Sequence, residues 1–142
     1  MAMTMHLDIV SAEEGIFSGT VHEVYAPSKS GELGIFPRHA QLLSQLVPGE
    51  VRVKAEGHSE MLHFFVSGGM LEVQPHVVTV LADTAIRAKD LDEAQALEAK
   101  QRAEEAMGNR EAEADYARAQ AELIQAEAQL RMIKNIRSIT RG

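Results

Sequence analysis

The chain lacks cysteine altogether over its 142 residues. It therefore has no disulfide framework, no thiolate metal site and no cysteine nucleophile, which fits a protein of a reducing compartment. It also lacks a long apolar run. The most hydrophobic stretch, residues 61–82, is interrupted by two histidines, a glutamate and a glutamine, so no segment is expected to span a bilayer. The first residues show no basic region and no cleavage signal, so no signal peptide is expected.

Motifs for catalysis are missing as well. The pair Gly68-Gly69 is not followed by a lysine and is no P-loop, and no Gly-x-Ser-x-Gly elbow occurs. The six histidines show no metal-ligand spacing, and His63 is interpreted as an ordinary sheet residue. Asp90 and Asp92 form an Asp-x-Asp pattern that helix capping explains better than metal binding. The net charge of −7 argues against nucleic-acid binding. A small β-domain enzyme is the least favoured hypothesis.

Proline and glycine divide the chain into two parts, residues 1–87 and 88–142. All four prolines and eight of the ten glycines lie in the first part, whereas the second part has no proline and only Gly108 and Gly142. Short alternating apolar segments with frequent turn signals predict an antiparallel β-sandwich or barrel for residues 1–87. The expected strands are residues 5–10, 21–25 (ending at Pro27), 51–54, 60–66, 70–73 and 77–81, with a short segment at residues 16–17.

One segment does not fit a plain strand. Residues 31–40 read GELGIFPRHA, which places two glycines and a proline around three apolar residues. We expect a shaped loop with Glu32, Arg38 and His39 as polar tips. An ordinary sandwich turn is the alternative interpretation.

The second part predicts two helices joined by a short break. Asp90 with Glu93 has the spacing of a capping box, so the first helix is expected from about residue 91 to about 107, with Gly108 as its stop. The second helix is expected from about residues 111–115 to about Arg137. Its apolar stripe is spaced 4-3-4-3-4-3 and comprises Ala112, Tyr116, Ala119, Leu123, Ala126, Leu130 and Ile133; the first helix answers with Ala96, Ala99, Ala103 and Ala106.

These faces predict an antiparallel hairpin with close backbones. Alanine offers little apolar area, so such a face packs weakly, while its high helix propensity keeps each helix formed. A stable hairpin and a hairpin that separates are both compatible with the pattern.

The charges at the end of the second helix also have two interpretations. Residues 131–142 hold four basic residues and no acidic one, which fits either dipole complementarity at a helix end or docking onto an acidic partner.

Three stretches carry a resemblance to a known family. They are GELGIFPRHA (residues 31–40), SGGMLEV (67–73) and VLADTA (80–85), the last leading into DLDEA (90–94). In this order and spacing they closely resemble the ε subunit of bacterial F-type ATP synthase, and the similarity covers nearly the whole chain. The resemblance implies an α+β protein, with an antiparallel β-sandwich of about ten strands followed by an antiparallel two-helix hairpin.

The resemblance also implies a function without catalysis. The ε subunit is a central-stalk component that binds the γ subunit and the ring of c subunits, peripheral to the cytoplasmic face of the bacterial inner membrane and without inserting into it. Glu32, Arg38 and His39 are the implied c-ring contacts. The tail is implied to inhibit ATP hydrolysis when it extends toward the catalytic head of α and β subunits. Arg131, Lys134 and Arg137 are then the implied contacts with acidic β-subunit loops.

The sequence departs from the family at one motif. Some members bind ATP through I/L-D-x-x-R-A, and the matching residues 91–96 read LDEAQA. Asp92 keeps the aspartate of the motif, but Gln95 replaces the arginine, and an amide cannot pair with phosphate as a guanidinium does. No cofactor is therefore expected. A stand-alone nucleotide-sensing module is the alternative function.

Overall fold

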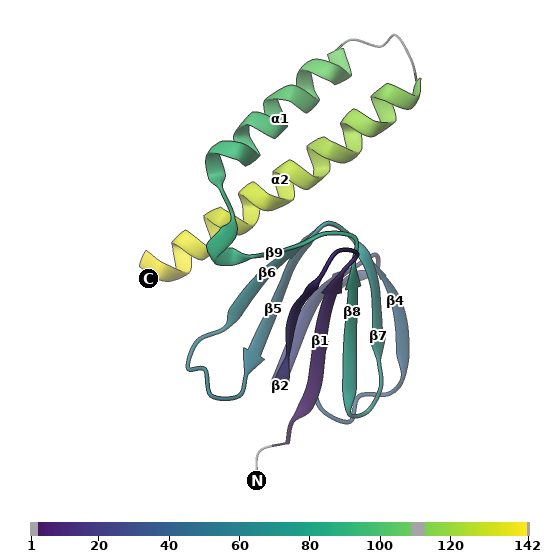
Figure 1. Ribbon diagram of the computed structural model, residues 1–142, viewed down its shortest axis with the longest axis vertical. Helices are drawn as coiled ribbons and strands as arrows, with labels where there is room; N and C mark the ends of the chain where they lie inside the picture. Colours follow the sequence, from purple (N-terminus) through teal and green to yellow (C-terminus); the bar gives the residue numbers. More distant parts are fainter. Residues whose placement is uncertain (1–2, 109–112, 142) are drawn as a thin grey trace. The chain divides into compact units, whose positions relative to one another are not determined.

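The computed structural model describes residues 3–108 and 113–141 of the chain. These residues form two compact units that meet between Lys89 and Asp90. The first unit is built from β-strands and the second from two helices (Figure 1). This agrees with the predicted fold class of a β-sandwich followed by a helical hairpin. No helix within the described ranges is long and apolar enough to cross a membrane.

The described part of the first unit contains nine strands, close to the number expected. They are β1 (Met5–Ser11), β2 (Gly15–Ser28), β3 (Gly31–Ile35), β4 (Leu42–Leu46), β5 (Gly49–Ala55), β6 (Leu62–Val66), β7 (Gly69–Val73), β8 (Val77–Ala82) and β9 (Ala85–Arg87). All their pairings are antiparallel except that of β1 with β8, which is parallel. The predicted antiparallel sandwich is therefore present, with this one parallel pair in it. The reason for the parallel pair is that β8 lies between its sequence neighbour β7 and the first strand of the chain, and it runs in the same direction as β1.

Strand β2 belongs to both layers of the sandwich. Its first half pairs with β1, and its second half pairs with β3 on one edge and β5 on the other. A register shift between Val21 and Glu23 marks the change. One layer is therefore β4, β7, β8, β1 and the start of β2, and the other is β3, the end of β2, β5, β6 and β9.

The core lies between these layers and follows the period of two that the sequence shows. On β1, Met5, Leu7 and Ile9 are buried, as expected. The same alternation buries Val51 and Val53 on β5, and it continues through Leu71, Val73, Val78 and Val80 on β7 and β8. Burying one such side chain contributes about 1.5–3 kcal/mol, so this shared core stabilises the first unit.

Two expectations for the first unit were wrong. Strand β2 does not stop at Pro27, because Pro27 pairs with Glu32 of β3 and its carbonyl accepts a hydrogen bond from the Val47 amide at 2.9 Å. Residues 31–40 are also not one loop. Their first half is strand β3, and only residues 36–40 form a loop.

The second unit starts with a short 3-10 turn, Ala88–Asp90, and continues with α1 (Glu93–Gly108) and α2 (Glu113–Arg141). Asp90 was predicted to cap α1, and this prediction was wrong. The cap is Asp92, because its Oδ1 accepts hydrogen bonds from the amides of Ala94 at 2.9 Å and Gln95 at 3.2 Å. The preceding residues are drawn into the 3-10 turn, which moves the helix start two positions along the chain.

The buried side chains of the two helices are small, apart from Met132 of α2, which is 1% exposed. Ala96 and Ala103 of α1 and Ala119 and Ala126 of α2 are buried. The larger members of the α2 stripe are partly buried, namely Tyr116, Leu123, Leu130 and Ile133. Ala106 is exposed, so the predicted α1 face is shorter than expected. Ala112 lies outside the described residues.

Candidate functional sites

The first candidate site is strand β3, which begins after a tight turn. The Ser28 hydroxyl donates to the Gly31 carbonyl at 2.6 Å and accepts from the Ser30 amide at 3.1 Å. Gly31 has a φ of 117°, a conformation that favours glycine. This turn fixes the register of β3 against β2 and so sets which way Glu32 points.

Glu32 is held by a cluster on the neighbouring strands. Its Oε1 accepts from Arg52 Nη2 at 2.6 Å, and the Arg52 guanidinium lies 4.7 Å from the centre of the Tyr25 ring. The Tyr25 hydroxyl donates to Glu23 at 3.1 Å. Partial desolvation and this hydrogen bond raise the pKa of Tyr25 above its usual value. The Glu32 side chain remains 54% exposed, so it is positioned and still accessible to a partner.

Arg38 and His39 lie together on the loop that follows β3. Arg38 has a φ of 66°, and its amide donates to the Pro75 carbonyl at 2.9 Å. The His39 ring nitrogen Nδ1 and the Ala40 carbonyl are 2.7 Å apart. The Arg38–Pro75 hydrogen bond ties the loop to the turn between β7 and β8. The structure thus brings Arg38 and His39 together, whereas Glu32 has a separate partner on β5.

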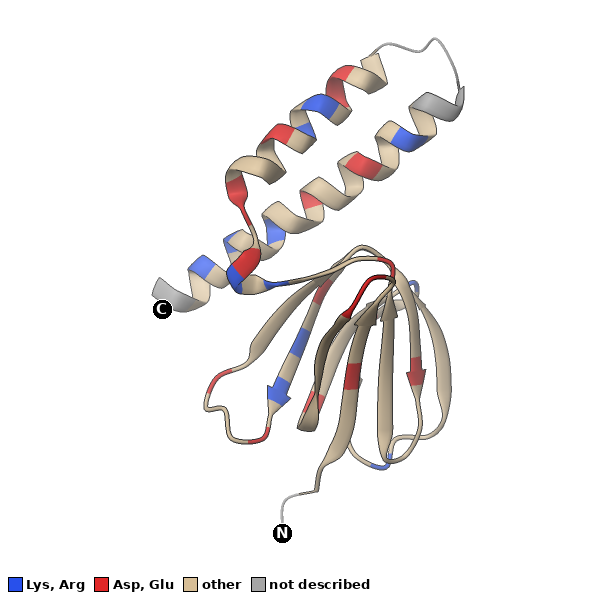
Figure 2. Ribbon diagram, viewed as in Figure 1, with Lys and Arg blue, Asp and Glu red and all other residues tan. Residues whose placement is uncertain are grey.

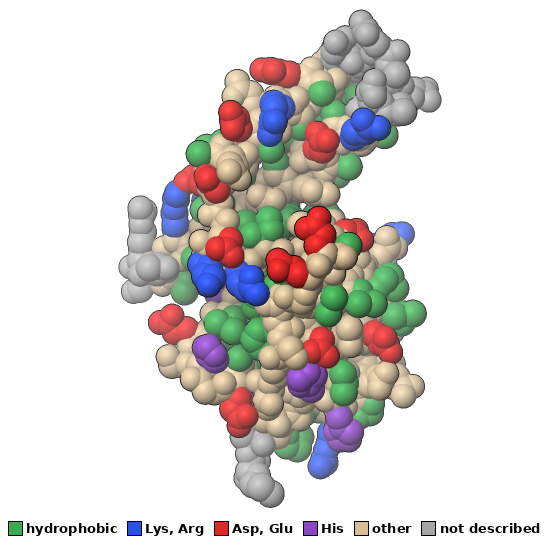
Figure 3. Space-filling model, viewed as in Figure 1, with side chains coloured by type: hydrophobic (Ala, Val, Ile, Leu, Met, Phe, Trp, Pro, Cys, Tyr) green, Lys and Arg blue, Asp and Glu red, His purple; other side chains and the backbone are tan. Residues whose placement is uncertain are grey.

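A second candidate site is an apolar row that the sequence analysis missed. Val10 of β1, Leu81 of β8 and Met70 of β7 are direct neighbours across the strands. All three point outward and are between 36% and 47% exposed. Figure 3 shows hydrophobic side chains gathered over the part of the first unit where Figure 1 labels β7 and β4. The sequence does carry a signal for this row, because β8 has apolar residues on both of its faces. A sheet with one face in water needs apolar residues only on its other face.

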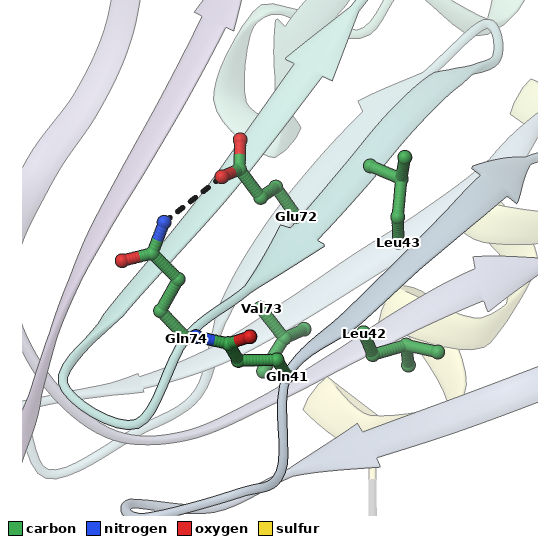
Figure 4. A pocket seen from close by; sticks show the side chains of 6 residues that line it. All are labelled: Gln41, Leu42, Leu43, Glu72, Val73 and Gln74. Atoms are coloured by element: carbon green, nitrogen blue, oxygen red, sulfur yellow. Dashed lines mark hydrogen bonds between the residues drawn. The ribbon is translucent and has the colours of Figure 1, made fainter.

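A shallow hollow lies on the same layer where β4 begins and β7 ends. It is lined by Gln41, Leu42, Leu43, Glu72, Val73 and Gln74 (Figure 4). The Gln74 side-chain amide donates to Glu72 at 2.9 Å, and Leu43 is 67% exposed. The hollow extends the exposed surface of this layer and holds no cluster suited to chemistry. Among the described residues, no group of three or more His, Cys, Asp or Glu side chains is arranged to hold a metal ion.

The third candidate site is the open end of the helical hairpin. Arg131, Lys134 and Arg137 are all exposed on α2. Figure 2 shows the basic residues of α2 gathered toward its C-terminal end. Arg137 is already engaged, because its two terminal nitrogens contact both carboxylate oxygens of Glu93 on α1. The structure therefore gives one of the three predicted contact residues a partner within the hairpin.

The residues that match the nucleotide-binding motif lie around the start of helix α1. Asp92 Oδ1 accepts from two amides at the start of α1. Gln95 is the third residue after this cap, where glutamine and glutamate are favoured. The sequence LDEAQA thus fits a helix start. The Asp92 oxygen that caps the helix is occupied by those two hydrogen bonds.

Comparison with known proteins assigns both units. The β-sandwich domain of the "ATP synthase, Delta/Epsilon chain" family matches residues 4–88, and the long α-helix domain of the same family matches residues 89–134. The ATP synthase epsilon chain of Thioalkalivibrio sulfidiphilus is 65% identical over 141 residues, covering 99% of this chain and 100% of its own. That of Nitrosococcus oceani is 65% identical over 138 residues, covering 96% and 97%.

Solved structures show the same fold at lower identity. A chain of the Euglena gracilis mitochondrial ATP synthase (OSCP/F1/c-ring, rotational state 1) has a TM-score of 0.78 at 23% identity, covering 88% of this chain and 78% of its own. A chain of the Tetrahymena thermophila mitochondrial ATP synthase central stalk and c ring has a TM-score of 0.64 at 15% identity, covering 92% and 97%. With two family domains matched end to end and relatives at 65% identity, this chain belongs to the epsilon chain family of bacterial F-type ATP synthases.

Proposed function

We propose that the chain is a non-catalytic rotor subunit of the central stalk. It couples rotation of the c ring to the catalytic head through γ, and its helical hairpin inhibits ATP hydrolysis. It binds peripherally at the cytoplasmic face of the inner membrane. The family match supports membership in the complex. The observation that carries the role is the exposed apolar row on the sandwich, because such a row on a small protein marks a docking surface.

The apolar row of Val10, Leu81 and Met70 is the surface that we assign to γ. The row runs across three hydrogen-bonded strands, so its side chains are fixed relative to one another. A rigid apolar strip binds a partner without the entropic cost of ordering a loop, since its backbone is already in place. Torque needs such a rigid contact, and the strands of a packed sandwich supply it.

The experiment that tests this assignment uses two matched leucines. Leu81 on β8 is 47% exposed, and Leu97 on α1 is 51% exposed. Leu81→Asp places a charge in the middle of the row and is expected to weaken binding to purified γ at least tenfold. Leu97→Asp makes the same chemical change outside the row and leaves binding within twofold. Equal effects of the two variants on γ binding would show that the row is not part of the γ interface.

The c ring is assigned to the loop that carries Arg38 and His39, together with Glu32. The loop is anchored to the Pro75 carbonyl, and Glu32 is anchored to Arg52, so each presents a fixed polar group. Cysteines placed at Glu32 or His39 should form crosslinks with the polar loops of c subunits in the assembled enzyme. Crosslinks to other subunits alone would refute the assignment.

Inhibition of hydrolysis is assigned to the hairpin. Its buried residues are mostly alanines, which offer little apolar area each, and each helix carries residues of high helix propensity. Deleting residues 108–142 should raise ATP hydrolysis by the assembled enzyme and leave assembly intact. Replacing Arg131, Lys134 and Arg137 with alanine should weaken inhibition if they dock on acidic surfaces. If inhibition persists in that triple variant, the basic end is only a complement to the helix dipole.

ATP is not assigned as a ligand of this chain. Asp92 caps α1, and Gln95 lacks the guanidinium that would pair with a phosphate. Calorimetry of the isolated chain with ATP should give no binding in the submillimolar range. Binding in that range would favour the alternative function of a nucleotide-sensing module.

A further inference from the structure

A two-point ion pair closes the open end of the hairpin. Arg137 Nη1 donates to Glu93 Oε1 at 3.3 Å, and Arg137 Nη2 donates to Oε2. A guanidinium that meets both oxygens of a carboxylate is directional as well as charged, so this pair fixes the approach of the helices.

The position of the pair in the hairpin determines its effect on separation of the helices. Glu93 is the first residue of α1, and Arg137 lies in the last turns of α2. The chain itself connects the helices at their other end, between Gly108 and Glu113. The Glu93–Arg137 pair therefore holds the end that the covalent chain leaves free, which is the end where separation of the helices must begin.

The rest of the interface offers little resistance to separation. Apart from Met132 of α2, the buried residues of the two helices are alanines such as Ala103, which is fully buried, and Ala126, which is 3% exposed. A methyl group contributes little apolar area. Among the described contacts of the hairpin, the pair is the one that joins the helices with matched charge.

The ion pair between Glu93 and Arg137 can also open at small energetic cost. The Glu93 and Arg137 side chains are 39% and 55% exposed, so neither is stranded in an apolar site when the pair opens. Glu93 stays at a helix N-terminus and Arg137 near a helix C-terminus, where their charges remain favourable. Both partners can therefore leave each other at small cost.

We propose that Glu93 is the latch of the closed hairpin, and that Arg137 exchanges Glu93 for a carboxylate of the catalytic head when α2 is released. The inference rests on the proposed inhibitory role of the hairpin. Arg137 is one of the three cations assigned to docking, and one guanidinium cannot hold two such partners in the same two-point geometry. Closing and docking thus compete for the same side chain. The latch needs no nucleotide, which accounts for closure in a chain where Gln95 replaces the arginine of the motif.

The test measures opening through a buried thiol in the full-length chain. The chain has no cysteine, so Ala103→Cys introduces a single thiol that reacts with a maleimide only when the hairpin opens. Glu93→Gln in this background is expected to raise the reaction rate about two- to fivefold, the range of an exposed ion pair. Glu98→Gln is the matched control on the same helix and should leave the rate unchanged. Ala126→Cys provides a second reporter should Ala103→Cys disturb the fold.

Double substitution and salt make the outcome decisive. Arg137→Gln should raise the rate as much as Glu93→Gln, and the two together should do no more than either alone. The reversed pair, Glu93→Arg with Arg137→Glu, should restore slow reaction. Salt at 1 M should speed the parent chain and leave Glu93→Gln unaffected. Equal rates for Glu93→Gln and Glu98→Gln, or additive effects of the two latch variants, would overturn the latch.

Hydrolysis by the assembled enzyme separates the latch from the function on which it rests. Glu93→Gln should strengthen inhibition, because it frees Arg137 for docking, whereas Arg137→Gln should not. If the thiol rates change as expected but removal of residues 108–142 leaves hydrolysis unchanged, the latch stands and the inhibitory role falls. If Glu93→Gln weakens inhibition while deletion of the tail relieves it, the proposed exchange is wrong.

Discussion

Substituting Gly69 with alanine should destabilise the sandwich more than any comparable glycine change. Gly69 begins β7 with a φ of 137°, and a Cβ there would lie 2.0 Å from the Leu81 carbonyl oxygen and 2.9 Å from the Ala82 Cα. The unfavourable φ contributes about 1–3 kcal/mol. The forced shift of β8 adds about 1–3 kcal/mol, as overpacking does. The expected loss of unfolding free energy is therefore about 2–6 kcal/mol.

Two other glycines separate these contributions. Gly57 has a φ of 84° and open space around its Cβ, so Gly57→Ala should cost only the conformational part, about 1–3 kcal/mol. Gly15 has neither a positive φ nor a close neighbour, and Gly15→Ala should be within about 0.5 kcal/mol of the parent. Urea unfolding followed by the NMR amide signals of the buried strands measures all three. If Gly69→Ala is no more destabilising than Gly57→Ala, the close approach of β7 and β8 is not as described.

The close approach of β7 and β8 matters for function because it determines the spacing of side chains in the apolar row. Gly69 precedes Met70, and Leu81 is the direct partner of Met70 on β8. Moving β8 away would separate the two side chains that we assign to γ. Gly69→Ala is thus expected to weaken γ binding through the spacing of the strands, with every apolar side chain of the row still present.

Three further predictions concern single side chains. Asp92→Ala should destabilise α1 by about 0.5–2 kcal/mol, measured by hydrogen exchange of its amides, whereas Asp90→Ala should have little effect. The hydrogen bond from Ser18 lowers the pKa of Asp8, so this carboxylate adds stability above its unfolded pKa that is lost as the pH falls through its folded pKa. Ser18→Ala should move the pKa of Asp8 up in an NMR titration and make acid unfolding less steep; an unmoved pKa would contradict the assignment. Arg52→Ala should cost less than about 1 kcal/mol in urea unfolding, because its ion pair is exposed, and a larger loss would show a structural role.

The sequence predicts the parts of this fold that depend on local pattern. The alternation of Met5, Leu7 and Ile9 identifies β1 and its buried face, and the break near Gly108 separates the helices. Strand β3 was expected to be part of a loop. Strands β4 and β9 were not predicted, because they are short and pair with strands distant in sequence. Pairing of this kind is decided by tertiary packing rather than by local propensity.

The sites were harder to predict for the same reason. Glu32 stands out in the sequence, but its partner Arg52 lies on another strand and becomes apparent only from the register of β2 with β5. The cap shifted from Asp90 to Asp92 because residues 88–90 form a 3-10 turn, and either aspartate satisfies the pattern alone. The row of Val10, Leu81 and Met70 joins three strands, one of them in parallel, which no local pattern encodes.

The most direct test of the central claim places a photo-crosslinking amino acid at position 81 in the assembled ATP synthase. Leu81 is the middle residue of the apolar row, and its side chain points outward. Illumination should yield one main adduct, with γ, and the same amino acid at position 97 should yield far less of it. No adduct with γ from position 81, or a main adduct with a subunit outside the rotor, would contradict the account.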